Sequence, residues 1–142
     1  MLFRSPGKLA EYAALKQDGL NTIELDVKDE GGEIGFAPAG VPLARKTGAV
    51  RSYYAPRKVA DMLHKKGLYL IGRIVVFQDP YLARSRPDMA IRRPDGSIWA
   101  TSAGLEWVNP YDRRVWDYAV SVAAAAARAG AQVGRASCRE RV

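Results

Sequence analysis

Predicted helices and strands alternate along this chain, and a helix passes into the following strand through little more than a glycine. The first helix is predicted to begin at Ser5-Pro6, where serine can cap the helix and proline sacrifices no hydrogen bond, and to end at Gly19. Residues 20–27, LNTIELDV, alternate between apolar and polar side chains, so we expect a half-buried strand directly after that glycine.

The same order is repeated further along the chain. A second helix is predicted from Pro56 to Gly67, although Ala55 is a poor cap and costs about 1 kcal/mol relative to Asp or Ser. The strand predicted at 68–77 is almost wholly apolar, as expected for burial on both faces. A third helix is predicted over 109–130. This alternation with short links predicts an α/β fold with parallel strands.

The connections from strand to helix are much longer. Residues 28–55 and 78–107 each span nearly thirty positions, whereas such loops ordinarily have about 2–6 residues. Residues 91–99 in the second loop predict a small hairpin around a Pro-Asp-Gly turn. In a parallel α/β fold these loops leave the carboxyl ends of the strands, where ligands bind. The sequence therefore predicts a ligand site at that end of the sheet.

Charged residues at the end of the first strand are candidates for this site. By alternation Asp26 and Lys28 share a face with Glu24, so these groups are expected to converge. Two interpretations stay open for Asp26 and Lys28: binding of substrate hydroxyls or acid–base chemistry, or an ion pair between Lys28 and a neighbouring acid. For Glu30 we favour a solvated position in the turn.

Arg73 interrupts the apolar second strand, and a buried guanidinium needs a partner. We favour an ion pair with Asp26 on the neighbouring strand, and binding of an anion or a substrate oxygen is the alternative. Asp79 follows that strand and is predicted either to bind substrate or to cap the next turn.

Aromatic side chains gather in the long loops. Exposed rings beside carboxylates suit sugars, because sugar C–H faces stack on rings while acids accept hydroxyl hydrogen bonds. For any single ring, packing within its own loop is the simpler interpretation, above all for Trp99. The set shifts the interpretation towards carbohydrate and comprises Tyr53, Tyr54, Tyr81, Trp99, Trp107 and Tyr111.

Composition limits the other function classes. The chain has a single cysteine and a single histidine, His64, so we expect neither a metal site nor a disulfide framework. The sequence also lacks a phosphate-binding glycine loop, so we expect no nucleotide cofactor. The net charge of +7 is dispersed and lacks an RNA-binding aromatic motif, so we expect no nucleic-acid partner. No apolar run reaches the roughly 18 residues of a membrane span.

Three stretches of the chain resemble the glycoside-hydrolase-like family called domain of unknown function 4015. They begin GLNTIELDVKDEGGEIGF at residue 19, VPLARKTGAVRSYYAPRK at residue 41 and WVNPYDRRVWDYAVSVA at residue 107. The resemblance covers roughly residues 5–130 and implies a (β/α)8 TIM barrel, a carbohydrate or glycan substrate, no cofactor and a bacterial protein of the envelope or exterior. It departs at Ala55, where an aspartate is expected, and this affects only a helix cap.

The resemblance also implies which part of a site this chain would hold. Family members continue beyond the third helix with a strand that carries an aspartate, a leading catalytic candidate, and the segment from Ala131 replaces it here. The catalytic carboxylates are therefore expected on other strands. We expect one wall of the substrate site to comprise Asp26, Lys28, Arg73, Asp79 and Trp107. The alternative function is a non-catalytic, glycan-binding barrel of the cell envelope.

The end of the chain differs in composition from the rest. A third strand is expected beyond Gly130, but residues 131–142, AQVGRASCRERV, have little apolar content, so none is predicted there. The last part of this segment, residues 134–142, GRASCRERV, is also basic. We favour a translated adapter fused to a truncated gene, with a native disordered tail as the alternative. Residues 1–133 are accordingly expected to form the amino-terminal part of a barrel that typically needs about 250 residues, and the fragment is expected to be inactive alone.

Overall fold

The computed structural model of the chain describes residues 11–136. Residues 11–14 are helical and continue into a 3₁₀ turn, η1 (Leu15–Asp18), which Gly19 ends with a left-handed φ of +91°. The predicted helix start at Ser5-Pro6 lies outside the described residues. The remaining elements follow in the order β1 (Thr22–Lys28), α2 (Pro42–Lys46), α3 (Pro56–Lys65), β2 (Tyr69–Ile74), α4 (Pro80–Ser85), η2 (Pro87–Met89), α5 (Arg113–Arg128) and β3 (Gln132–Ala136).

The three strands form one parallel sheet in the order β1-β2-β3. Strands that are consecutive in sequence are thus neighbours in space, which confirms the predicted parallel α/β arrangement. The register pairs Ile23 with Leu70 and Asp26 with Arg73, and it shifts between Asp26 and Lys28. That shift decides where the Lys28 side chain lies.

Strand β3 corrects the prediction that no strand follows α5. Its backbone pairs with β2 at Ile71–Gln132 and Gly72–Val133. Low apolar content misled the prediction, because the hydrogen bonds of a strand come from the backbone and α5 leads the chain back to the free edge of β2. Residues 134–136 of the predicted tail lie in this strand. The origin of the tail stays a prediction, and residues 137–142 lie outside the described part.

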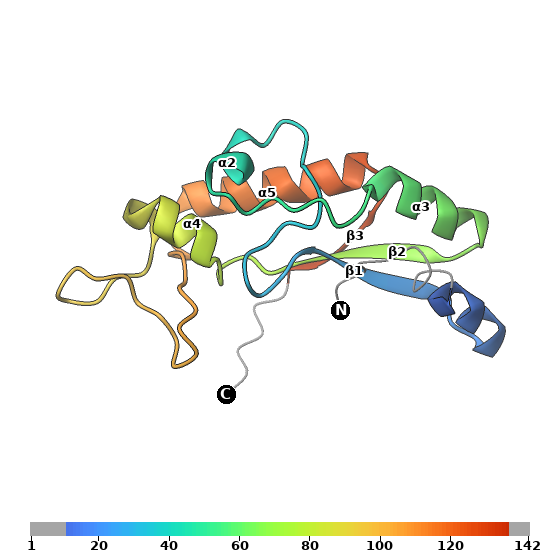
Figure 1. Ribbon diagram of the computed structural model, residues 1–142, viewed down its shortest axis with the longest axis horizontal. Coiled ribbons are helices and arrows are strands. Elements are labelled where there is room, and N and C mark those ends of the chain that lie inside the picture. Colours follow the sequence, from blue (N-terminus) through green and yellow to red (C-terminus); the bar gives the residue numbers. More distant parts are fainter. Residues whose placement is uncertain (1–10, 137–142) are drawn as a thin grey trace.

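Helices α3 and α5 cover one face of the sheet (Figure 1). Under α3, Ala60 and Leu63 pack against Ile23, Leu25 and Leu70. A second cluster lies under α5 and extends into the loops at the carboxyl ends of the strands; its buried members include Val27, Ile74, Val115 and Val122. No helix within residues 11–136 has both the length and the apolar character needed to cross a membrane.

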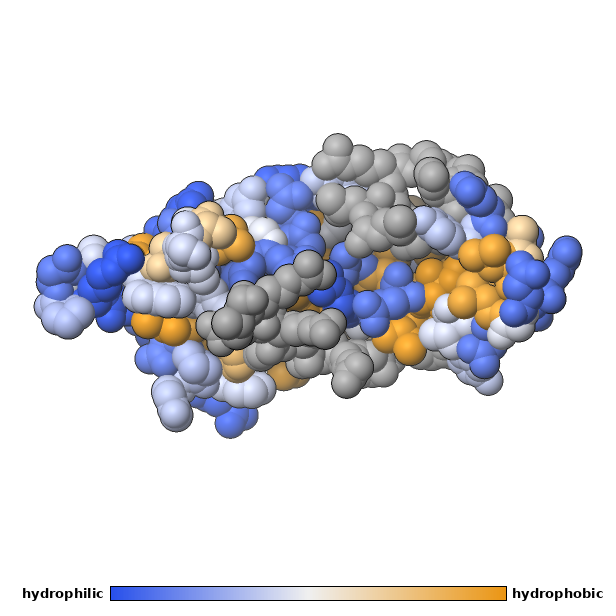
Figure 2. Space-filling view, turned by 90° about the horizontal axis from the view of Figure 1, so that it is seen from below, coloured by the Kyte–Doolittle hydropathy of each residue, from blue (hydrophilic) through white to orange (hydrophobic). Residues whose placement is uncertain are grey.

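The opposite face of the sheet carries no helix among the described elements. Seen from that side, a hydrophobic area lies towards the amino ends of the strands, and hydrophilic residues lie towards their carboxyl ends (Figure 2). Alternation along β1 and β2 sends Glu24, Asp26 and Arg73 to this face, because Ile23, Leu25 and Leu70 point to the helices. The charged side chains of β1 and β2 therefore lie on the face of the sheet that has no helical cover.

The predicted hairpin in the second loop is confirmed. Arg92 bridges to Ile98, Trp99 N–H donates to Ile91 O at 2.8 Å, and Gly96 turns the chain with φ +85°. The loop extends from the carboxyl end of β2 (Figure 1). The short helices α2 and α4 were not predicted, although each starts with proline at its first position.

Candidate functional site

Arg73 is the centre of a charged cluster on the helix-free face, which we call the strand-end cluster (Glu24, Asp26, Glu30 and Arg73). Its Nε donates to Asp26 Oδ1 at 2.5 Å and its Nη1 to Glu30 Oε1 at 2.6 Å, while Glu24 Oε1 lies 3.7 Å from Nε. The Asp26–Arg73 ion pair favoured from the sequence is thus confirmed. Glu30, expected to be solvated, is exposed but also pairs with Arg73.

These contacts orient the three acids around one guanidinium. The hydrogen bond from Arg73 lowers the pKa of Glu30, and the bonds to Asp26 and Glu30 raise the pKa of Arg73. Three carboxylates share one guanidinium, whose side chain is 19% exposed. An oriented carboxylate accepts hydrogen bonds from hydroxyl groups, so this cluster has the chemistry of a sugar-hydroxyl site.

Lys28 does not share the face of Glu24 and Asp26, contrary to the prediction. Because the register of β1 shifts after Asp26, Val27 and Lys28 are both buried and the alternation ends. Lys28 Nζ donates to Val75 O at 2.6 Å and lies 3.2 Å from Asp79 Oδ2. Of the two interpretations of Lys28, the structure shows the ion pair.

Asp79 is the partner of Lys28 and also the cap of α4. Its Oδ1 accepts the N–H of Leu82 at 2.9 Å, so the capping alternative is confirmed. The side chains of Lys28 and Asp79 are 1% and 0% exposed, and neither reaches solvent in this conformation. Gly32 packs directly on this carboxylate, because a Cβ there would lie 2.8 Å from Asp79 Oδ1. The pair fixes the end of β1 to the segment that follows β2.

Gln78 links the strand-end cluster to the aromatic residues of the second loop. Its Nε2 donates to Glu30 O at 2.6 Å, and its backbone forms a bridge with Trp107. Trp107 is half-buried and packs edge-to-face against Trp99, with ring centroids 6.4 Å apart. Trp99 therefore packs within its loop, as expected. Acids, a guanidinium, an amide and an indole thus follow one another along the strand ends.

A second polar network was missed from the sequence. Glu33 Oε1 accepts from Arg51 Nε at 3.0 Å, and Oε2 accepts from Tyr53 Oη at 2.6 Å. Arg51 Nη2 also donates to Tyr81 Oη at 2.5 Å. The hydrogen bond from Tyr53 lowers the pKa of Glu33, and Arg51 acts in the same direction. The network holds the first loop against α4. The sequence analysis singled out only the two tyrosines of this network, as aromatic residues of the long loops. Glu33 and Arg51 are isolated charges in a loop, and such charges do not indicate their partners.

Asp29 lies at the same end of the sheet but differs in its electrostatics. Burial raises the pKa of this carboxyl group, although the Glu33 N–H donates to its Oδ1 at 2.9 Å. A carboxyl group with a raised pKa is suited to hold a proton, whereas Glu30 and Glu33 have lowered pKa values. Among residues 11–131, no three His, Cys, Asp or Glu side chains are grouped so that they could hold a metal ion.

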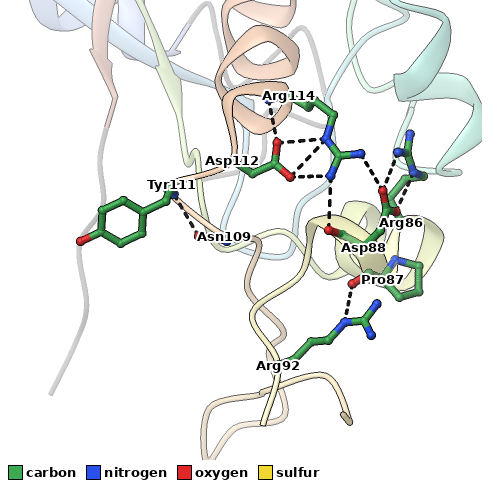
Figure 3. Close-up of polar contacts among 8 residues, drawn as sticks. All are labelled: Arg86, Pro87, Asp88, Arg92, Asn109, Tyr111, Asp112 and Arg114. Carbon is green, nitrogen blue, oxygen red and sulfur yellow. Dashed lines mark hydrogen bonds and ion pairs between the residues drawn. The ribbon is translucent and has the colours of Figure 1, made fainter. Parts of the chain in front are cut away.

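An exposed network joins η2 to the start of α5 (Figure 3). Asp88 pairs with Arg86 at 2.8 Å and with Arg114 at 2.7 Å, and Arg114 also pairs with Asp112 at 2.6 Å. The network anchors the base of the hairpin loop. Tyr111 points away from the network and its side chain is 95% exposed. The other predicted loop aromatics are half-buried, so Tyr111 is the most accessible of the set to a ligand.

Comparison with known proteins identifies relatives. The sequence profile of the family described as "Putative glycosyl hydrolase domain" matches residues 5–133. A hypothetical protein from Ruminiclostridium thermocellum has 30% sequence identity to the chain and a TM-score of 0.87, and the match covers 93% of this chain and 70% of that protein. No curated protein matches the sequence.

Two solved glycosidases share the fold at lower sequence identity. An α-amylase from Lactobacillus plantarum is 18% identical with a TM-score of 0.56 over 86% of this chain. An α-galactosidase from Lactobacillus brevis is 15% identical with a TM-score of 0.63 over 87% of this chain. The chain spans 33% of the amylase and 17% of the galactosidase, so these likenesses concern part of each enzyme.

Proposed function

The chain belongs to the family described as "Putative glycosyl hydrolase domain", and from this membership we propose that the full-length protein hydrolyses O-glycosidic bonds in a polysaccharide or another glycan. The observation that carries the proposal is the strand-end cluster. Its acids and guanidinium come from adjacent parallel strands and the turn after β1, and Gln78 connects the cluster to Trp107, which packs on Trp99. This combination suits hydroxyl-rich rings that also present apolar C–H faces.

For the fold, the proposal is that β1, β2 and β3 are consecutive strands in the amino-terminal part of a (β/α)8 barrel. Two features support it: sequence-adjacent strands are spatial neighbours, and α3 and α5 lie on one face of the sheet. The helix-free face would then be the interior of the barrel. The structural likeness to an α-amylase and an α-galactosidase agrees with this assignment.

Within that barrel, Asp26 and Arg73 are proposed to contact sugar hydroxyls, and Trp107 to stack on a ring. Lys28 and Asp79 are proposed to contribute to substrate binding indirectly. Their buried ion pair fixes the end of β1 to the segment that follows β2, and these strand ends carry the proposed site. The two carboxylates that cleave a glycosidic bond would come from other strands. Residues 1–133 alone are therefore proposed to lack activity. Residues 134–142 are proposed to be non-native in sequence, with residues 134–136 completing β3 through backbone pairing.

The second candidate is a barrel that binds envelope glycans without hydrolysing them. One observation favours it: the strand-end carboxylates of Asp26, Glu30, Glu33 and Asp79 are each ion-paired. For Glu30 and Glu33 the hydrogen-bond partners also lower the pKa of the carboxyl group, and a carboxyl group with a lowered pKa accepts hydrogen bonds well but is a poor general acid. The proposed partner is a carbohydrate in both cases.

The test is made in the full-length protein. A panel of polysaccharides is incubated with the wild type and with Asp26→Asn, and the release of reducing ends and glycan binding are both measured. Hydrolysis that falls at least tenfold in Asp26→Asn supports the proposed site. Asp117→Asn, an exposed carboxylate of α5, is the matched control and should retain activity. Binding without turnover, unchanged in Asp26→Asn, would refute both the hydrolase assignment and this site.

A further inference from the structure

Three successive carbonyl groups at the end of β1 accept hydrogen bonds from three different residues. Asp26 O accepts from the Tyr54 hydroxyl at 3.0 Å, Val27 O from the Gly35 N–H at 3.1 Å, and Lys28 O from the Val75 N–H at 3.0 Å. The first loop supplies two of these three donors, and only the third donor follows β2. The first loop therefore contacts β1 at the residues where the register of the sheet shifts.

The shift in register is a β-bulge. Asp26 pairs with Arg73 and Lys28 with Ile74, so Val27 is an extra residue on β1. A bulge sets the directions of the side chains beside it. Here the Asp26 carboxylate meets Arg73, whereas the Lys28 side chain is buried. The placement of the Asp26 carboxylate thus depends on the contacts that hold the bulge.

The ring of Tyr54 is held on several sides. A Cβ on Gly35 would lie 2.5 Å from Tyr54 Cε1, so the backbone of the first loop lies directly against the ring. The ring centroid is 6.1 Å from that of Phe36, and Tyr54 packs against both apolar clusters, the one under α3 and the one under α5. These contacts fix the ring and with it the position of the hydroxyl that bonds to Asp26 O.

The Tyr54 hydroxyl keeps its proton and is the donor of this hydrogen bond. Burial raises the pKa of the hydroxyl, and the negative charge of Asp26 acts in the same direction. The packing of the ring does not require the hydroxyl, since phenylalanine would fill the same apolar space. The contribution of the hydroxyl is therefore its contact with the backbone of Asp26.

We propose that Tyr54 is a positioning residue of the strand-end cluster. Its hydroxyl fixes the backbone of Asp26, so that the Asp26 carboxylate meets Arg73 and a sugar hydroxyl at the same time. The sugar contact rests on the proposed function, whereas the placement of Asp26 against Arg73 needs no substrate. Tyr54 acts through Asp26, so loss of its hydroxyl weakens glycan binding and leaves the bond-breaking step intact.

The first measurement needs no substrate. In the full chain, hydrogen exchange of the Arg73 Nε–H, which donates to Asp26, is followed by NMR. We expect exchange to be about three- to tenfold faster in Tyr54→Phe, because one hydrogen bond that holds Asp26 is lost. Tyr53→Phe is the matched control, since it removes a hydroxyl of the same loop that donates to Glu33, and it should exchange as the wild type does. Unchanged exchange in Tyr54→Phe, or equal acceleration in Tyr53→Phe, would overturn the proposal.

The second measurement uses the full-length protein with soluble starch, xylan and galactomannan as probes. On a probe that is cleaved, Tyr54→Phe should raise KM about three- to tenfold and leave kcat within about twofold. The double variant Asp26→Asn/Tyr54→Phe should bind no more weakly than Asp26→Asn, because Tyr54 acts through Asp26. Additive losses would overturn the proposal. If Asp26→Asn itself has no effect on any probe, the proposed function fails, and the exchange measurement still decides the role of Tyr54.

Discussion

Lys28 Nζ lies 3.2 Å from Asp79 Oδ2, and both side chains are removed from solvent. The pair joins the end of β1 to the residue that caps α4, and Lys28 also donates to Val75 O. It therefore couples two strands and a helix at the end of the sheet that carries the strand-end cluster. Such a pair is costly to break, because the remaining charge is left buried.

Lys28→Met is expected to destabilise the chain by about 3–5 kcal/mol, since it leaves the Asp79 carboxylate without its cation. Urea unfolding of the wild type and the variant measures this loss. The double variant Lys28→Met/Asp79→Asn should recover part of it, because asparagine can still cap α4 while carrying no charge. Strictly additive losses would show that the two residues do not act as a pair.

Gly72 in β2 is expected to be intolerant of any side chain. A Cβ at this position would lie 2.9 Å from Val27 Cγ2 on the neighbouring strand, closer than van der Waals contact permits. Gly72→Ala should therefore cost about 1–3 kcal/mol in thermal or urea unfolding. Val27→Ala in the same chain removes the clashing methyl group, so the penalty for adding alanine should largely disappear. Gly40→Ala cannot serve as a control for adding a methyl group without a clash, because Gly40 has a φ of +77° and alanine would strain the backbone there.

The alternation of β1 and the apolar run of β2 were sufficient to predict the parallel sheet and its helical cover. They also predicted the Asp26–Arg73 ion pair, because parallel strands in simple register place these residues side by side. The Pro-Asp-Gly turn predicted the hairpin for a local reason: its geometry depends on a few adjacent residues. Each of these correct predictions rests on residues that are close in sequence or on the regular alternation of side chains along a strand.

The errors have a common physical cause. Alternation placed Lys28 beside Glu24, but a shift in register redirected it to Asp79, fifty-one residues away, and no local pattern encodes such a shift. Strand β3 was missed because its backbone pairing needs only a free neighbouring edge. The contacts of Glu33 with Arg51 and Tyr81 likewise depend on the folding of long loops.

Asp29 and Glu33 are expected to affect stability with opposite dependence on pH. Burial raises the pKa of Asp29 above 3.8, so the folded state binds its proton more tightly and stability falls as pH rises through the interval above 3.8. The pKa of Glu33 lies below 4.5, so its contribution is present above 4.5 and is lost as pH falls through the interval below it. The change in unfolding free energy that Asp29→Asn causes, measured against the wild type, should therefore be more favourable at pH 7 than at pH 3.5.

Urea midpoints at pH 3.5 and pH 7 measure both effects. Glu33→Gln should show the reverse behaviour and lose more stability at pH 7 than at pH 3.5. Asn at position 29 can still accept the hydrogen bond from the Glu33 N–H, so the change isolates the charge. If Asp29→Asn destabilises the chain equally at both pH values, hydrogen bonding outweighs burial at this position.

Arg73 is expected to be essential for holding the strand-end acids together. Arg73→Met leaves the carboxylates of Glu24, Asp26 and Glu30 without their shared guanidinium, so their repulsion should destabilise the chain by about 1–3 kcal/mol at pH 7. The loss should be smaller at pH 3.5, where protonation relieves the repulsion. Arg84→Met, which removes an exposed bidentate contact with Glu106, should cost less than about 1 kcal/mol. Equal losses in the two variants, independent of pH, would mean that Arg73 contributes packing and does not organise the charge on which the proposed glycan site depends.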